Sequence, residues 1–559
     1  MSFYSSRLKF LLIMFFVLIS LISARLLFLQ LIIGQELAIE AIRVRNQEIP
    51  LNIARGDILD KNGILLTNTS QKYSVFIFPN EISDIKTTIE TLNNITNIPL
   101  SSLEKLYLKN NVPFRLITDL DSATAQRIND LNLKGVISIS ETTRYNNNSL
   151  AAHIIGYINK ADNKGVSGIE KTYDDFLKGN DSFYVTATLD AEADIIPGLG
   201  YKVFKSTTNN VQHNVILTID KQLQEEVESI MDSYVKKGAI VVLKPDTGEI
   251  LAIASRPNFN ANKLERYLYE ESAPLLNRAF LAYQPGSIFK IIVAAAAFED
   301  KKNNFDIDTN FFDQGYIEVN GTTFWSWEYE QYGSRGTITL TDAMAFSSNP
   351  VFIEIALKLG AEDVINMAKK MGLGSITNLN FDNEQEGRLP NPQGIYQAEL
   401  ANLAIGQGIC EATPIQLAQV LSIIANNGIK KDLRVIDKIV DNEGNIIRDY
   451  KNIDQQKERV ISLKTAQKLQ KMLFAVTTYG TGQQAQIEEY KSAGKTGSAE
   501  TGIKDEKGRS ISHAWFAGYT PYDDPKYVVV VFVENGMSGG EIAAPIFQKI
   551  ATKALALDS

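Results

Sequence analysis

Strand-like sequence lies at the two ends of the C-terminal part of this 559-residue chain, and helical sequence fills the long interval between them. Residues 238–257 (GAIVVLKPDTGEILAIASRP) contain two β-rich runs around Pro-Asp-Thr-Gly, a pattern typical of a β-hairpin. Three further strand candidates lie at 491–500, 513–520 and 526–534, and a helix-like end follows at 542–556. We therefore expect one antiparallel sheet closed by both ends of this region and flanked by helices, which is an α+β fold.

Hydrophobic periodicity predicts the remaining elements. The middle of the chain, 285–480, is mostly helical in pattern, whereas residues 46–205 form a mixed, polar stretch without a recognisable set of catalytic residues. The predicted helices are 84–94, 122–132, 221–237, 287–299, 340–359, 361–371, 411–427 and 463–478, and the predicted strands outside the main sheet are 73–78 and 215–220.

The segment Phe10–Ile33 is long and apolar enough to cross a membrane. It has 24 residues and a single charge, Arg25, which can extend towards the headgroups. A cleaved signal peptide is the alternative, but the best cleavage site has Ile22 at the −3 position and the apolar run continues beyond it. We favour an uncleaved anchor, and Arg7 and Lys9 before it predict a cytoplasmic N-terminus.

Length and composition limit the possible chemistry. The chain is too long for one hydrophobic core, which indicates two to four domains. The single cysteine, Cys410, excludes an internal disulfide, iron–sulfur clusters and thiolate zinc sites, and three scattered histidines make a histidine-rich metal site hard to build. The net charge of −9, without blocks of like charge, argues against nucleic-acid binding. We expect neither a metal nor a cofactor.

Three glycine-containing segments match known signatures without the features that the corresponding chemistry requires, and the first of them is better interpreted as a glycine-rich turn. Residues 536–540 (GMSGG) match a nucleophile elbow, yet no histidine follows them to act as base. Residues 480–485 (GTGQQA) match a dinucleotide fingerprint, yet they follow a helical pattern instead of a strand. Gly494-Lys495-Thr496 resembles the end of a phosphate-binding loop, but Glu489 stands where the first glycine is required.

The pattern Ser-x-x-Lys occurs six times, and only the pair Ser287 and Lys290 has a distinctive setting. The pair follows a Pro-Gly turn, and the next residues, 291–298 (IIVAAAAF), are apolar nearly all round and hence buried. Ser287 is expected at the N-terminus of this helix, where the dipole favours negative charge, with Lys290 one turn later on the same face. Because burial disfavours an ammonium group, Lys290 can be neutral and accept the serine proton.

A second polar segment, Ser347-Ser348-Asn349, comes sixty residues after Ser287, between two helical segments. Ser347 can relay a proton towards the leaving group, and Asn349 can hold a substrate amide.

A third segment, Lys495-Thr496-Gly497-Ser498, begins 208 residues after Ser287 on a strand candidate. Lys495 supplies a second cation, which disfavours protonation of Lys290 and attracts an anionic substrate. The hydroxyls of Thr496 and Ser498 can bind a carboxylate, and Gly497 permits close backbone approach. The backbone N–H groups of Ser287 and Ser498 form the candidate oxyanion hole.

These segments resemble the S-x-x-K, S-x-N and K-T/S-G motifs of the penicillin-recognising serine transferases, and nearly the whole chain is similar to a class B penicillin-binding protein. Residues 55–63 (RGDILDKNG) match the R-G-x-I-x-D-R-x-G element of that family, with Lys61 in place of the usual arginine. Further matching sequence lies at 151–157, 168–179, 217–224, 277–290, 404–408, 412–418 and 495–500.

The resemblance implies a division into four parts. They are a cytoplasmic tail at 1–9, a transmembrane anchor at 10–33, an extended non-catalytic pedestal of the dimerisation type at 34–210, and a transpeptidase domain at 211–559. The transpeptidase domain is expected to have the penicillin-binding serine transferase fold, with a five-stranded antiparallel sheet. The protein is then expected in the bacterial inner membrane as a single-pass protein whose catalytic domain is extracytoplasmic.

The resemblance also implies the reaction. Ser287 would attack the penultimate D-Ala carbonyl of a stem peptide ending in D-Ala-D-Ala, with Lys290 as base, and an amine from a neighbouring stem peptide would complete a cross-link. β-Lactams would mimic this peptide end and acylate Ser287. Since the pedestal is too short for a glycosyltransferase domain, a SEDS-type glycosyltransferase is the implied partner, alongside other envelope machinery.

Other roles stay open at the level of sequence. A hydrolytic relative, a β-lactamase or carboxypeptidase, needs a water-activating glutamate, and the nearest match, Glu386-Gly387-Arg388-Leu389-Pro390, ends in proline where asparagine is required. A non-catalytic sensor or envelope scaffold would be expected to have more membrane spans or to lose Lys290 or Lys495. Residues 513–516 (HAWF) resemble elongation-type members, but 347–352 (SSNPVF) do not, so roles in cell elongation and in division are both retained.

Overall fold

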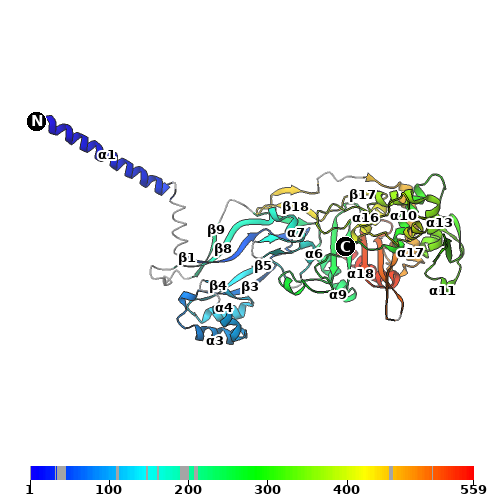
Figure 1. Ribbon diagram of the computed structural model, residues 1–559, viewed down its shortest axis with the longest axis horizontal. Coiled ribbons are helices and arrows are strands. Elements are labelled where there is room, and N and C mark those ends of the chain that lie inside the picture. Colours follow the sequence, from blue (N-terminus) through cyan, green and yellow to red (C-terminus); the bar gives the residue numbers. More distant parts are fainter. Residues whose placement is uncertain are drawn as a thin grey trace. The chain divides into compact units, whose positions relative to one another are not determined.

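The computed structural model describes residues 2–31, 33, 46–108, 113–146, 149–159, 163–188, 201–206, 212–451, 458–506 and 508–558 (Figure 1). The chain forms two compact units, and the first comprises Met1–Ala54, Ser70–Thr143 and Gly179–Val211. The second comprises Arg55–Thr69, Arg144–Lys178 and Gln212–Ser559. Two segments of the expected pedestal, 55–69 and 144–178, therefore pack within the second unit.

The predicted apolar helix is α1 (Ser2–Leu31). Its stretch Leu8–Gln30 has 23 residues and a mean hydropathy of 2.6, so it is long and apolar enough to cross a membrane. Two capped helices of the first unit were also predicted, α3 (Ile85–Thr96) and α5 (Ser122–Asp130). The side chains of Asp84 and Asp121 accept hydrogen bonds from the first turns of these helices, which explains where each one begins.

The first unit contains two three-stranded sheets. One has the order β4 (Phe114–Leu120), β3 (Ser70–Ile77) and β5 (Val136–Thr143), and it packs with α3, α5 and α4 (Leu100–Leu108). The other has the order β1 (Asn46–Arg55), β8 (Lys178–Thr188) and β9 (Tyr201–Ser206). The part of the polar pedestal sequence that lies in the first unit therefore has an α+β structure.

The second unit is built on a five-stranded antiparallel sheet, as expected. Its order is β12 (Ile250–Arg256), β11 (Gly238–Leu243), β23 (Tyr527–Val533), β22 (Ser510–Thr520) and β21 (Ala493–Lys504). Strand β11, from the beginning of this region, pairs with β23 from its end, so both ends of the region close the sheet. The predicted α+β fold is confirmed.

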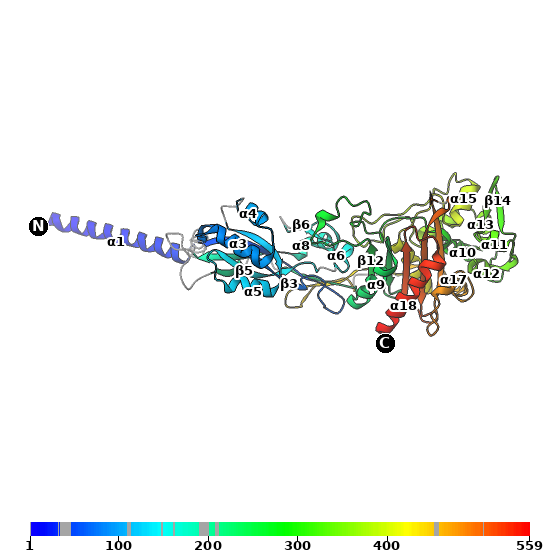
Figure 2. The same ribbon diagram turned by 90° about the horizontal axis from the view of Figure 1, so that it is seen from below.

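Helices cover both faces of this sheet. Val528, Val530 and Phe532 of β23 point to one face and Val529 and Val531 to the other, because successive side chains of a strand alternate. The first face packs on α16 (Pro414–Ala425), which is buried along its whole length, and the second packs on α18 (Ala544–Asp558) and α9 (Lys221–Tyr234) (Figure 2). A strand that is apolar on both faces needs helices on both sides of the sheet to keep its side chains out of water.

A buried ion-pair network ties the segments 55–69 and 144–178 together inside the second unit. Arg55 Nε donates to Glu170 at 2.6 Å and its Nη1 to Asp174 at 2.7 Å, while Arg144 Nε donates to Glu170 at 2.8 Å. Tyr145 donates a further hydrogen bond to Glu170. Because Glu170 is fully buried, the two arginines are required to compensate its charge, and the first residue of the 55–63 element is therefore structural.

Candidate active site

The Ser287 motif lies at the beginning of the buried apolar helix, as predicted, but its first turn is a 3₁₀ helix. Residues Gly286–Phe289 form the turn η3, and α10 (Lys290–Glu299) continues from it. Because a 3₁₀ helix has three residues per turn, positions 287 and 290 lie directly above one another. Ser287 is half-buried, whereas Lys290 is fully buried, so the hydroxyl is accessible and the amine is shielded.

The Lys290 amine joins the first two motifs. Its Nζ donates to the carbonyl oxygen of Ser347 at 2.6 Å, to Ser347 Oγ at 3.1 Å and to Asn349 Oδ1 at 2.7 Å. Burial lowers the pKa of Lys290 well below its usual value, and the nearby Lys495 lowers it further, against the opposing effect of Asp313. The geometry thus provides a shielded amine that tends towards its neutral form.

The residues 340–359, helical in pattern, form two helices, with the Ser347 segment between them as expected. Helix α12 (Leu340–Ala345) ends before the motif and α13 (Asn349–Leu359) begins within it, capped by the Ser348 hydroxyl. The break occurs at Ser347, whose φ of 61° lies in the left-handed region. That conformation costs a residue with a Cβ about 1–2 kcal/mol, so the surrounding contacts must hold it in place.

The third motif lies on β21, the last strand in the sheet order. Lys495 is fully buried, its Nζ donates to the Thr496 carbonyl at 3.1 Å, and burial lowers its pKa to about 7. The hydroxyls of Thr496 and Thr481 lie 2.7 Å apart, and Ser498 Oγ accepts a hydrogen bond from Gly539 N. The strand therefore presents hydroxyls beside a second buried amine.

Glycines allow the strand to lie directly against the Ser287 turn. A Cβ on Gly497 would be 2.8 Å from the Pro285 carbonyl oxygen, and a Cβ on Gly286 would be 2.7 Å from the Ser498 carbonyl oxygen. The peptide units around Ser287 and Ser498, the two expected oxyanion donors, are therefore neighbours.

Gly406 holds the Ser287 turn from its other side. Gly286 N donates to the Gly406 carbonyl, and a Cβ on Gly406 would lie 2.0 Å from the Gly286 carbonyl oxygen. Its φ of 69° also favours glycine. The glycine of the 404–408 segment thus has a specific role in shaping the nucleophile turn.

Replacing Gly406 by alanine is expected to lower both thermal stability and the rate of acylation. Gly394→Ala is the matched control, because Gly394 has a φ of 88° but open space around a Cβ. Both variants lose about 1–2 kcal/mol to the left-handed backbone, and only Gly406→Ala adds a steric clash. Thermal melting and the rate of penicillin labelling measure the difference, and equal losses in the two variants would contradict this explanation.

Two of the glycine-containing turns support the site. Thr481 N donates to the Ala345 carbonyl, so the 480–485 turn lies against the end of α12. Gly539, in the 536–540 segment, packs against Gly497. A Cβ on Gly539 would lie 2.4 Å from the Gly497 carbonyl oxygen. Sequence reasoning rejected their signatures and missed their contribution to the site, because contacts between distant segments leave no local signal.

The remaining candidates lie outside this arrangement. The side chain of Glu386, the nearest match to a water-activating glutamate, is exposed, and its carbonyl accepts a hydrogen bond from Gln416. Among the described residues, no group of three or more His, Cys, Asp or Glu side chains is placed to hold a metal ion.

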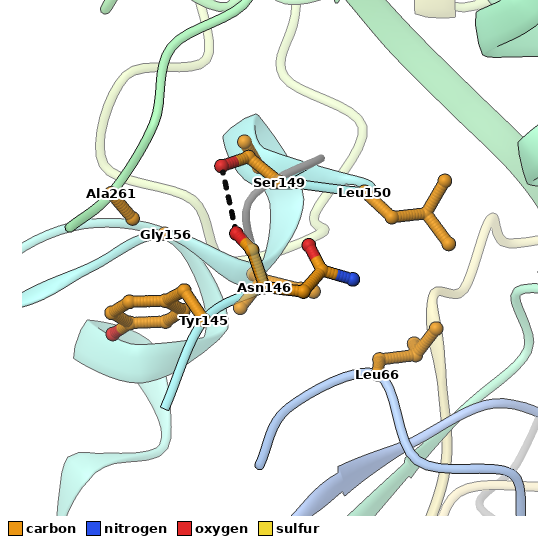
Figure 3. A pocket seen from close by; sticks show the side chains of 9 residues that line it. Leu66, Tyr145, Asn146, Ser149, Leu150, Gly156 and Ala261 are labelled. Atoms are coloured by element: carbon orange, nitrogen blue, oxygen red, sulfur yellow. Dashed lines mark hydrogen bonds between the residues drawn. The ribbon is translucent and has the colours of Figure 1, made fainter. Parts of the chain in front are cut away.

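A small cavity also lies in the second unit, away from these motifs. It measures about 10 Å³, which is room for about one water molecule. Figure 3 shows that Leu66, Tyr145, Leu150 and Ala261 contribute to its lining, and none of the predicted site residues does.

A nucleophile turn, a buried amine held by a Ser-x-Asn motif and a Lys-Thr-Gly strand together define a penicillin-recognising serine transferase. Residues 238–552 match the penicillin-binding protein transpeptidase domain, and residues 50–197 match the penicillin-binding protein dimerisation domain. The chain therefore belongs to the penicillin-binding protein transpeptidase family, and the two domains together place it in class B.

Similar proteins cover almost the whole chain. Stage V sporulation protein D of Bacillus subtilis is 31% identical over 98% of this chain and 85% of that protein. The peptidoglycan D,D-transpeptidase FtsI of Buchnera aphidicola is 31% identical over 96% of this chain and 92% of that protein. Among solved structures, penicillin-binding protein PBP2 of Helicobacter pylori, in a complex with MreC, has a TM-score of 0.68 at 24% identity and covers 92% of this chain and 99% of that one.

Proposed function

We propose that the chain is a peptidoglycan D,D-transpeptidase that cross-links stem peptides in cell-wall synthesis through an acyl-Ser287 intermediate. The observation that carries this proposal is the fully buried Lys290 amine, one turn from the accessible Ser287 and with its pKa lowered. Two relatives at 31% identity and the H. pylori structure belong to the same family, and one of the relatives is named a peptidoglycan D,D-transpeptidase.

Acylation begins when Lys290 Nζ accepts the proton of Ser287 Oγ and the oxygen attacks the penultimate D-Ala carbonyl carbon. The backbone N–H groups of Ser287 and Ser498 stabilise the developing oxyanion. As the C–N bond breaks, the leaving D-Ala amine takes a proton through Ser347, which already contacts Lys290. An amine of a second stem peptide then attacks the ester carbon and gives a proton to Lys290 Nζ. The C–O bond to Ser287 breaks, and Ser287 Oγ takes a proton back from Lys290.

The other site residues bind the substrate. Asn349 Oδ1 accepts one hydrogen bond from Lys290 and has a second lone pair for a substrate amide N–H. Thr496 and Ser498 hydroxyls bind the terminal carboxylate, Gly497 lets the peptide approach the strand, and Lys495 attracts the negative charge. A β-lactam carries the same carboxylate and acylates Ser287 in the same way.

The apolar α1 anchors the protein in the bacterial inner membrane as a single-pass helix, with residues 1–9 in the cytoplasm and the catalytic unit outside. The support is the pair of basic residues before the span, Arg7 and Lys9. Residues 50–197 match the dimerisation domain, and a SEDS-type glycosyltransferase is the proposed source of the glycan strands.

The acyl-enzyme is expected to persist for many minutes, because Glu386 is exposed and no water-activating carboxylate contacts the Lys290 cluster in the described part of the chain. Intact-mass spectrometry after a pulse of penicillin measures the adduct, which has the mass of the protein plus one whole penicillin. Ser287→Ala is the control for non-covalent carry-over. Return to the unmodified mass within seconds would make the protein a hydrolase.

The transfer reaction itself is tested with a synthetic stem pentapeptide ending in D-Ala-D-Ala and a free amine acceptor. Cross-linking releases one D-Ala for each amide formed, whereas a carboxypeptidase releases D-Ala without forming an amide. A protein that is labelled by penicillin but gives neither product would be a sensor or scaffold.

A further inference from the structure

An aromatic segment lies against the Ser347 motif and was not singled out by the sequence. It consists of the hairpin β14 (Tyr316–Val319) and β15 (Thr322–Trp325) and the residues that follow it, up to Tyr332. Its side chains include the largely exposed Trp325 and Trp327, which are 51% and 64% accessible. A tryptophan combines a large apolar ring with one N–H donor, so an exposed one can both pack and hydrogen-bond at the rim of a site.

The exposed Trp327 has such a partner. Its indole Nε1 donates to the Phe346 carbonyl oxygen at 3.3 Å, and this carbonyl belongs to the peptide bond that leads into Ser347. The Phe346 ring is held as well, with the Arg335 guanidinium 3.7 Å from its centroid and the Tyr479 ring edge-on at 5.9 Å. The peptide before Ser347 is thus fixed from the solvent side by an indole.

This peptide controls the position of the groups around Lys290. Ser347 is in the left-handed region with a φ of 61°, a conformation that persists only when its surroundings impose it. Both its carbonyl oxygen and its hydroxyl accept hydrogen bonds from Lys290 Nζ. A rotation of the Phe346–Ser347 peptide would therefore move two of the three acceptors of the amine.

The same segment holds the third acceptor. Asn349 Nδ2 donates to the Trp325 carbonyl oxygen at 2.7 Å, which turns Asn349 Oδ1 towards Lys290. This contact uses the backbone of residue 325, so it survives a change of the side chain. Trp325 and Trp327 are both exposed indoles. The Trp325 ring packs on Tyr316 and Tyr329, and the Trp327 ring donates to the motif, so the two positions separate lost packing from a lost hydrogen bond.

We propose that Trp327 is a positioning residue of the transpeptidase reaction, which acts through the Phe346 carbonyl to keep Ser347 and Lys290 in the geometry for proton transfer. The inference rests on the proposed function, because it assigns Trp327 to the same acylation step. In the described part of the chain Trp327 donates to the Phe346 carbonyl and to none of the reacting groups, so a ring without a donor is expected to replace it only in part.

The test compares Trp327→Phe with Trp325→Phe in the full-length protein, using the second-order rate constant for acylation by a fluorescent penicillin. Loss of one hydrogen bond predicts a rate about three- to tenfold lower in Trp327→Phe and less than about twofold lower in Trp325→Phe. The pH profile adds a readout that lost packing would not change. Weaker acceptors for the Lys290 ammonium disfavour its charged form. The rise of the acylation rate with pH should therefore occur at lower pH in Trp327→Phe only.

A second variant at position 327 separates loss of the hydrogen bond from misfolding. Benzothienylalanine at position 327 keeps the shape of the indole and replaces its N–H by sulfur, and it should reproduce the slower rate with an unchanged melting temperature. Equal acylation rates and equal pH profiles in the variants at positions 325 and 327 would overturn the inference and leave the proposed function intact. Labelling that persists in Ser287→Ala would instead overturn the proposed function.

Discussion

Replacing Ser287 by alanine is expected to abolish covalent labelling by fluorescent penicillin. The ester to the antibiotic forms on Ser287 Oγ, and the alanine variant has no atom there to form it. The loss should exceed that of any other single replacement in the site, since removal of a nucleophile eliminates the covalent step. Labelling is measured by fluorescence after denaturing electrophoresis, with thermal melting to show that the catalytic unit is folded.

Ser233→Ala is the matched control for this prediction. Ser233 and Lys236 form another Ser-x-x-Lys sequence, but Ser233 is exposed on α9, where its hydroxyl donates to the Ser229 carbonyl of the preceding turn. This variant should label like the wild type. Labelling of Ser287→Ala above the background of heat-denatured protein would place the nucleophile elsewhere.

Replacing Lys290 by methionine or by arginine is expected to slow acylation by about 10²–10⁴-fold, the usual contribution of a general base. Methionine fills the buried space without a base, and arginine retains a charge and donors but cannot lose its proton. Both variants should therefore acylate slowly, although arginine retains the charge and methionine does not. Lys290→Ala should also lose nearly all labelling while the domain stays folded.

The pH dependence has a definite sign. Acylation needs neutral Lys290, so in the wild type the rate should rise with pH through the lowered pKa of this lysine and reach its plateau well below the usual value of 10.5. In Lys495→Met the repulsion from the second cation is lost, the ammonium form of Lys290 becomes more favourable, and the acid limb should move to higher pH. Stopped-flow acylation across a pH series measures both profiles. An acid limb unchanged by Lys495→Met would contradict the electrostatic coupling of the two lysines, and a rate independent of pH in the wild type would remove Lys290 as the base.

Periodicity located most of the elements because each depends on its own residues. The helix predicted at 463–478 is α17 (Leu463–Thr478), and the predicted strand 526–534 differs from β23 by one residue at each end. The range 340–359 divides into two helices at the Ser347 segment, and the left-handed conformation there is imposed by Lys290 and by neighbouring chain segments. No local pattern indicated that the 144–178 segment packs in the second unit.

By itself the sequence determined the α+β class, the apolar N-terminal helix and the order of the three motifs, since these follow from local alternation, apolar length and residue chemistry. Only the tertiary structure decided which backbones touch the Ser287 turn, how the acceptors surround Lys290, and that Trp327 reaches the Phe346 carbonyl. The physical reason is that burial and hydrogen bonding between residues far apart in the chain depend on how the elements pack, and no window of neighbouring residues carries that information.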